Sequence, residues 1–188
     1  MNTEEILEYS KIIKVEADDL LVNLDLLKIL QNFGEVIITG SYSLDLMIKR
    51  DLDISLVNEN MSIGKFFELG QSLNVCLNPH SMYFRNTIMK PIDNRPPNSL
   101  YWGVQTEYWK IDLWKVPKYY AEESIEYINN FKNKLTPAKR EIVLTIKHTL
   151  LNNSDYGRKY SSKELYKAVL ENDVKNLDEF LDFLGKAI

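Results

Sequence analysis

The sequence predicts an α+β protein, in which a mixed β-sheet packed with helices is followed by a C-terminal helical bundle. Two observations support this fold class. Apolar and polar residues alternate in several segments in the middle of the chain, as they do in strands that bury one face. After Pro117 the composition changes from strand-like to helical and stays helical to the end. We therefore expect a sheet domain of residues 1–116 and a helical lobe of residues 117–188.

The N-terminal part of the chain is predicted to alternate helices and strands. Residues 3–33 are predicted to be helical, because leucines recur at helical spacing and Gly34 follows where a C-cap glycine is expected. A short strand rich in β-branched residues then ends at Gly40, and a second strand begins at Asp51. The predicted segments after the first helix are a strand, a helix, a strand and a helix at 36–39, 42–49, 51–56 and 61–76.

The pattern returns to a period of two at Ser81 and indicates a third strand. Residues 90–99 contain three prolines and are predicted to be a loop. Two further strands, 100–106 and 109–116, lie close enough in sequence to form a hairpin. The remaining segments are predicted to be helices at 119–134 and 137–150, one that starts at the Ser161–Glu164 capping box, and a last one around Leu177–Leu184.

Composition limits the class of protein. The chain has 23 Lys and Arg against 27 Asp and Glu, a net charge of −4. Proteins that hold a nucleic-acid backbone usually carry a basic excess, so a long nucleic-acid partner is not expected. No apolar run approaches the roughly 20 residues of a membrane span, and the N-terminus does not resemble a signal peptide. Cys76 is the single cysteine of the sequence, which excludes an internal disulfide. We expect a cytoplasmic protein with no membrane partner.

Acidic residues gather on one face of the predicted strand 51–56. The apolar residues at 52, 54 and 56 face one side, whereas Asp51 and Asp53 face the other. Two carboxylates so close together repel each other unless a cation lies between them, and Mg²⁺ prefers such oxygen ligands. The alternative is a pair of solvated carboxylates on an exposed sheet face.

These carboxylates form part of a longer motif. Gly40-Ser41 ends one strand, Asp51-Leu52-Asp53 lies on the next, and Asp112 supplies a third carboxylate between hydrophobic neighbours. In this order the motif resembles the signature of the polymerase-β-like nucleotidyltransferase superfamily. The resemblance covers residues 36–116 and implies a nucleotidyltransferase-like sheet, with Asp51, Asp53 and Asp112 as catalytic ligands of Mg²⁺, two ions being expected. We expect the helical lobe to bind the substrate.

The reaction of that superfamily implies further site residues. Its acidic ligands position a nucleoside triphosphate (NTP) and an acceptor hydroxyl, and pyrophosphate leaves. Gly40 and Ser41 match the turn that contacts the nucleotide phosphates, and Lys110 and Arg85 are further candidate nucleotide contacts. Asp112 faces the acceptor in this architecture and is a candidate metal ligand, general base or both. Structural roles stay open: Ser41 as a helix N-cap, and Asp112 in a salt bridge with neighbouring lysines.

A narrower similarity concerns the acceptor. Residues 40–46 are similar to a stretch in lincosamide and some aminoglycoside nucleotidyltransferases, which transfer AMP to an antibiotic hydroxyl. The sequence departs from theirs at Ser41 and Tyr42 and in a shorter gap before Asp51, and Asp45 stands where many superfamily members carry glycine. We therefore expect AMP transfer from ATP to a hydroxyl of a small-molecule acceptor, with antibiotics among the candidates. The alternatives are a protein acceptor, as in toxin–antitoxin nucleotidyltransferases, and a nucleotide-binding module without turnover.

Aromatic residues in the predicted hairpin could stack on a nucleobase, although strand aromatics usually belong to a core. They are Tyr101, Trp102, Tyr108, Trp109 and Trp114. The periodicity of the hairpin leaves both roles open.

Overall fold

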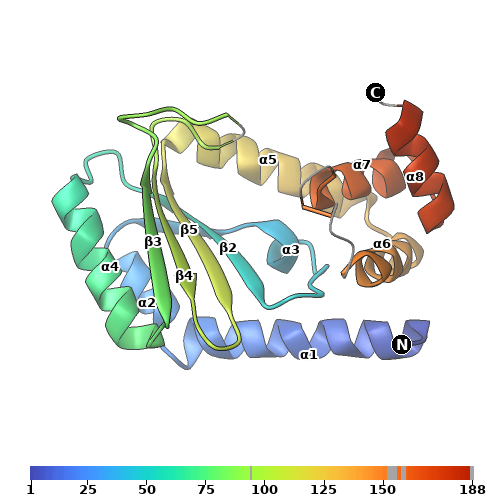
Figure 1. The fold of residues 1–188 in the computed structure, drawn as a ribbon, viewed down its shortest axis with the longest axis horizontal. Coiled ribbons are helices and arrows are strands. Elements are labelled where there is room, and N and C mark those ends of the chain that lie inside the picture. The colour runs from blue at the N-terminus through green and yellow to red at the C-terminus, as the bar shows by residue number, and fades with distance from the viewer. Residues whose placement is uncertain (94, 152–155, 158–159, 187–188) are drawn as a thin grey trace.

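The computed structural model describes residues 1–93, 95–151, 156–157 and 160–186. Within these residues the fold is α+β, as predicted, with five strands in one mixed sheet flanked by helices (Figure 1). The strands are β1 (Glu35–Ile38), β2 (Asp51–Val57), β3 (Ser81–Asn86), β4 (Leu100–Gln105) and β5 (Lys110–Val116). The helices are α1 (Thr3–Val22), α2 (Leu26–Gln31), α3 (Gly40–Ser43), α4 (Ile63–Leu77), α5 (Lys118–Lys134), α6 (Pro137–Leu150), α7 (Ser162–Asn172) and α8 (Leu177–Lys186).

The strand order is β1-β2-β5-β4-β3. Strands β2 and β5 are parallel, and the other three neighbouring pairs are antiparallel. The predicted hairpin of β4 and β5 is therefore confirmed. The connection from β2 to β5 contains α4, β3 and β4, and it returns the chain to the side of β2. This connection brings two segments that are distant in sequence next to each other at the centre of the sheet.

One face of the sheet packs against α1, α2 and α4 and forms one of the two cores of the described residues. Leu52 of β2 and Ile111 of β5 are fully buried on this face. Trp102 of β4 also lies here, and its Nε1 donates a hydrogen bond to the carbonyl oxygen of Phe66 in α4 at 2.9 Å. Because side chains alternate along a strand, the polar residues of the same strands project from the opposite face.

The helical segment predicted at 3–33 is two helices. Asp25 separates them: it has a left-handed backbone conformation, with φ of 56°, which turns the chain between α1 and α2. α2 already ends at Gln31, so Gly34 is not its C-cap. Gly34 instead lies close to the end of β2, where a side chain would meet the backbone of Val57.

The prediction of a helix at 42–49 is wrong in length, because the helix found there, α3, is a single turn. Asp45 follows it with φ of 54°, a conformation that glycine adopts freely and other residues adopt at a cost. Arg140 of α6 stabilises this turn, since its Nε donates to the Asp45 carbonyl oxygen at 3.0 Å and to Oδ2 at 2.8 Å. Asp45 therefore has a glycine-like backbone at the position where many nucleotidyltransferases carry glycine.

Helices α5 to α8 form the predicted C-terminal bundle (Figure 1). Their apolar residues make a second core, which also contains Ile6 of α1 and Leu44, Leu46 and Ile48 from the segment between α3 and β2. α1 therefore contributes to both cores. The division of the chain into two domains at residue 116 stays a prediction. No described helix combines the length and the apolar composition that a membrane span requires.

Candidate active site

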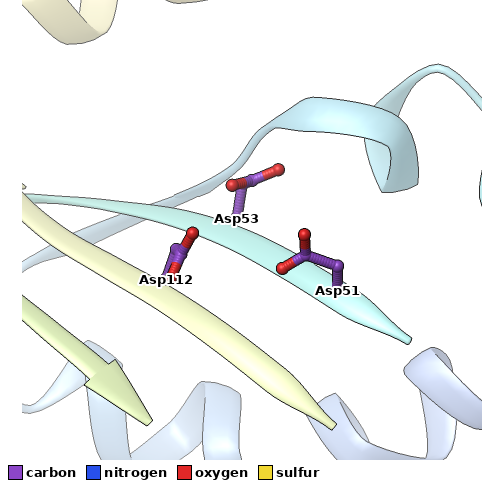
Figure 2. A group of neighbouring side chains, drawn as sticks. All are labelled: Asp51, Asp53 and Asp112. Atoms are coloured by element: carbon purple, nitrogen blue, oxygen red, sulfur yellow. The ribbon is translucent and has the colours of Figure 1, made fainter. Parts of the chain in front are cut away.

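Three aspartates converge on the open face of the sheet. The parallel register pairs Asp53 of β2 with Asp112 of β5, and Asp51 lies two residues before Asp53 on the same face. One carboxylate oxygen from each residue lies within 4.8 Å of the others. Figure 2 shows the three side chains rising from the two neighbouring strands on the same side of the sheet. The three predicted metal ligands are therefore brought together.

The three carboxylates repel one another. Burial and the charges of Asp51 and Asp112 raise the pKa of Asp53 to about 6. Burial also raises the pKa of Asp51, against the nearby charge of Lys110. The Lys110 ammonium contacts Asp112 Oδ2 at 2.6 Å and Asp51 Oδ1 at 3.3 Å. This ammonium offsets one of three negative charges, and the remaining oxygen donors fit a hard divalent cation such as Mg²⁺.

Asp112 is held by Tyr101, a residue whose link to the site is not visible in the sequence pattern. The Tyr101 hydroxyl donates a hydrogen bond to Asp112 Oδ1 at 2.6 Å. Gly103 of β4 lies directly opposite Asp112 in the register. A Cβ at Gly103 would lie 2.9 Å from Tyr101 Cζ, so the missing side chain is what lets the Tyr101 ring lean along β4 toward Asp112.

Gly40 forms the turn beside Asp53. Its φ is 63°, and a Cβ at this position would lie 2.9 Å from Asp53 Cγ, so only glycine fits without displacing the carboxylate. The backbone N–H and the hydroxyl of Thr39 both donate to the carbonyl oxygen of Asp53, at 2.8 and 3.3 Å. These contacts fix the end of β1 against β2. Gly40 and Ser41, predicted to bind nucleotide, consequently lie next to the aspartates.

A cleft of about 720 Å³ opens beside the aspartates, between the sheet and the helical lobe. Gly40, Ser41, Asp51 and Asp53 line one side of it. The size of the cleft is typical of sites that hold a small organic ligand. The lobe residues that line it come from α5, α6, α7 and the segment before α7, and include Tyr120, Ser124, Tyr127, Lys147, Tyr156, Ser162 and Tyr166.

Lys147 is a buried cation in the wall of this cleft. Its side chain is 4% exposed, and Nζ donates to the carbonyl oxygen of Leu46 at 2.6 Å and to the Tyr166 hydroxyl at 3.1 Å. Burial lowers the pKa of Lys147. An ammonium has three donors, and contacts with the described residues account for two of them, which leaves one for a ligand. The sequence carries one signal for Lys147: it is a charged residue one helical turn after the buried Val143, at a position of the amphipathic helix that normally faces a core.

The four residues predicted to bind nucleotide divide into two groups. Gly40 and Ser41 line the cleft, and Lys110 contacts two of the aspartates. Arg85 lies elsewhere, on the edge strand β3, where its guanidinium carbon is 5.4 Å from the ring centroid of Tyr83. The structure does not bring Arg85 to the cleft.

Solved structures share this arrangement of sheet and helices. The Cid1 poly(U) polymerase with Mg 3′-dATP bound matches with a TM-score of 0.59 and 18% identity, over 89% of this chain and 54% of its own. A cytoplasmic RNA terminal U-transferase matches with a TM-score of 0.58 and 17% identity, over 87% of this chain and 51% of its own. The chain therefore has the fold of these nucleotidyltransferases.

The predicted nucleotidyltransferase-like sheet is thereby confirmed. A second structure of Cid1, described for its RNA terminal uridylyl transferase activity, matches with a TM-score of 0.61 and 16% identity, over 90% of this chain and 55% of its own. At such identities the likeness is one of fold, and the chain spans about half the length of these nucleotidyltransferases. No protein-family model and no curated protein matches the sequence.

Proposed function

We propose that this protein transfers a nucleoside monophosphate from an NTP to an acceptor hydroxyl, with a divalent metal bound by Asp51, Asp53 and Asp112. The observation that carries the proposal is the convergence of these carboxylates within 4.8 Å of one another at the edge of a cleft. Solved structures with this fold contain Mg²⁺ with 3′-dATP or GTP, which supports Mg²⁺ as the metal. We expect two ions.

In this reaction the acceptor oxygen forms a bond to the α-phosphorus, and the bond from that phosphorus to the oxygen bridging to the β-phosphate breaks. Pyrophosphate leaves with that oxygen. Mg²⁺, when bound, would stabilise the negative charge of the triphosphate and of the acceptor oxygen as its hydroxyl loses a proton. Asp51 and Asp53 line the cleft and would hold the metal on the triphosphate side. Asp112, on the neighbouring strand, would hold it on the acceptor side and take up the hydroxyl proton.

The cleft offers contacts for the triphosphate from both walls. The Gly40 backbone and the Ser41 hydroxyl lie on the side of the aspartates, where phosphate oxygens would bind. The buried ammonium of Lys147 and the hydroxyl of Ser162 line the opposite wall. ATP is the expected donor, and the structural neighbours include a polymerase described for UTP selectivity, so all four NTPs belong in the test.

The acceptor that we propose is the 3′ end of an RNA. The structural neighbours are named as a poly(U) polymerase and an RNA terminal U-transferase. The net charge of −4 favours a small-molecule acceptor, but the likeness to these enzymes gives no support to a small molecule or an antibiotic. A terminal transferase needs to hold only a few nucleotides at a chain end, which a locally basic surface can do within an acidic protein.

The test is Mg²⁺-dependent pyrophosphate release from each NTP, with a short single-stranded RNA and with a panel of small hydroxyl compounds. We expect release with RNA and a lengthened product. Full activity in the Asp51→Ala and Asp53→Ala variants would overturn the proposal. Transfer only to a small molecule, or labelled nucleotide on a polypeptide, would reassign the acceptor, and NTP binding without product would identify a binding module.

A further inference from the structure

Three aromatic rings cross the open face of the sheet next to Asp112. Tyr83 of β3, Tyr101 of β4 and Trp114 of β5 form a row that we call the aromatic platform. The ring centroids of Tyr101 and Trp114 are 4.5 Å apart, and those of Tyr83 and Tyr101 are 6.5 Å apart. The strand register places all three rings on the face that carries the three aspartates.

The aromatic platform is partly exposed to solvent. Tyr83 is 57% exposed, and Tyr101 and Trp114 are half-buried. In contrast, Trp102 and Trp109 of the same hairpin are each 8% exposed and belong to the sheet core. Core packing therefore accounts for these two tryptophans and not for the platform, whose rings keep part of their surface in solvent.

Positive charge lies beside these rings. The guanidinium carbon of Arg85 is 5.4 Å from the Tyr83 ring centroid. Exposed rings next to guanidinium groups are the combination that binds single-stranded nucleic acid, because bases stack on the rings and phosphates pair with arginine.

The aromatic platform continues directly into the site of the aspartates. The Tyr101 hydroxyl donates to Asp112 at 2.6 Å. Asp112 lies on β5, between β4, which carries Tyr101, and β2, which carries the cleft-lining Asp51 and Asp53. An NTP in the cleft and a chain end on the platform would thus approach the three carboxylates from opposite sides. This arrangement is the one that in-line attack on the α-phosphorus requires.

We propose that the aromatic platform, together with Arg85, binds the acceptor as the last unpaired bases of a single-stranded RNA 3′ end. This inference rests on the proposed function and assigns the acceptor site. The terminal hydroxyl lies beside Asp112, gives its proton to that carboxylate as its oxygen bonds to the α-phosphorus, and pyrophosphate leaves. Arg85, predicted from the sequence to contact the nucleotide, contacts an acceptor phosphate instead.

Direct binding tests this site without turnover. Quenching of Trp114 fluorescence by a short unstructured RNA, lost in Trp114→Phe, reports occupancy of the platform. We expect Tyr83→Leu and Arg85→Gln each to weaken RNA binding by about tenfold. Tyr108→Leu is the control, because Tyr108 is 67% exposed and lines a surface depression beside α1. Equal RNA affinity in the wild-type, Tyr83→Leu and Arg85→Gln proteins would overturn the proposal.

Kinetics separate this inference from the proposed function. In Tyr83→Leu we expect the KM for RNA to rise about tenfold while the KM for the NTP stays at its wild-type value, because the cleft lies beyond the aspartates. RNA binding that depends on Tyr83, in a protein without Mg²⁺-dependent transfer, would refute the function and leave the binding site standing. Transfer to a small hydroxyl compound that depends on Tyr83, without RNA binding, would overturn the assignment to RNA.

Discussion

At the scale of single residues, Asp53 combines its proposed role as a metal ligand with a cost in stability. Its pKa is raised to about 6 by burial and by the charges of Asp51 and Asp112. Because the folded protein holds this proton more tightly than the unfolded chain does, the free energy of unfolding falls as pH rises through the window from about 4 to about 6. At neutral pH the full loss in the free energy of unfolding is present in the metal-free protein.

Asp53→Asn is therefore expected to separate stability from activity. In EDTA at pH 7.5 the substitution should raise the free energy of unfolding by up to about 2 kcal/mol, because it removes a repelled carboxylate. Mg²⁺-dependent pyrophosphate release should fall by about 100-fold or more, because a metal ligand is lost. Urea denaturation and the release assay measure the two effects. Asp182→Asn, at an exposed position, serves as the control and should change neither the free energy of unfolding nor pyrophosphate release. A destabilised Asp53→Asn protein would contradict the electrostatic argument.

The same raised pKa predicts how metal binding depends on pH. A protonated Asp53 cannot coordinate Mg²⁺, so binding must release the proton. We expect the apparent Kd for Mg²⁺ to be nearly constant above pH 7 and to rise by about tenfold for each pH unit below about 6. Titration calorimetry at several pH values measures this dependence. A Kd that does not change between pH 7 and pH 5 would show that Asp53 is not a ligand.

The sequence reveals residues whose chemistry follows from local spacing. Asp51 and Asp53 share a strand face by alternation, and Asp112 matches the motif between apolar neighbours. The positions of Tyr101 and Lys147 at the site cannot be predicted from local spacing, for different physical reasons. Tyr101 reaches Asp112 only through the cross-strand register and the space above Gly103, and Lys147 faces the cleft only because α6 packs against the sheet domain. Both depend on tertiary placement.

At the scale of secondary-structure elements, the turn from β1 into α3 is the most constrained part of the site. Gly40→Ala puts a Cβ against the Asp53 carboxylate at a backbone φ of 63°. We expect a loss of about 1–2 kcal/mol in stability from the left-handed conformation alone, and a large loss of activity because Asp53 is displaced. Denaturation and pyrophosphate release measure both.

Gly64→Ala is the matched control for that substitution. Gly64 lies in the first turn of α4, and a Cβ there would have only the Ser62 Oγ as a neighbour, at 3.8 Å. Helix propensity predicts that this variant is at least as stable as the wild type. If the two alanine variants had equal stability and equal pyrophosphate release, neither the backbone conformation at residue 40 nor the position of Asp53 would require a glycine there.

Most elements follow from the sequence, and the exceptions have local causes. The strands and the long helices agree with their predicted positions to within a few residues. The breaks at Asp25 and Asp45 do not, because both residues are aspartates in left-handed conformations that sequence patterns assign to glycine. At Asp45 the conformation depends on Arg140, a residue from a helix far along the chain.

At the scale of the whole molecule, α1 links the two cores. Ile13 and Ala17 pack in the core of the sheet, whereas Ile6 packs with the helical lobe. We therefore expect the chain to unfold in one cooperative transition. Far-ultraviolet circular dichroism reports all helices, and fluorescence reports the sheet, because all three tryptophans lie in β4, in β5 or in the turn between them. The two urea curves should coincide.

Two separated transitions would instead show that residues 1–116 and 117–188 are independent domains, as the change of composition at Pro117 suggests. A chain that ends at Val116 gives a second test. It would expose Ile6, Leu46 and Ile48, which the lobe buries, and we expect it not to fold. The sequence predicts the fold class of the whole molecule, while the sharing of α1 between the cores follows only from the packing.

The pairing of β2 with β5 also limits how this chain can change in length. Insertion or deletion of one residue inside either strand would turn its carboxylates toward the core and present Leu52 or Ile111 to the solvent. The segments that join the strands do not decide which face a strand residue takes. Length differences among evolving relatives should accordingly collect in these connections, while the two carboxylate-bearing strands keep their number of residues.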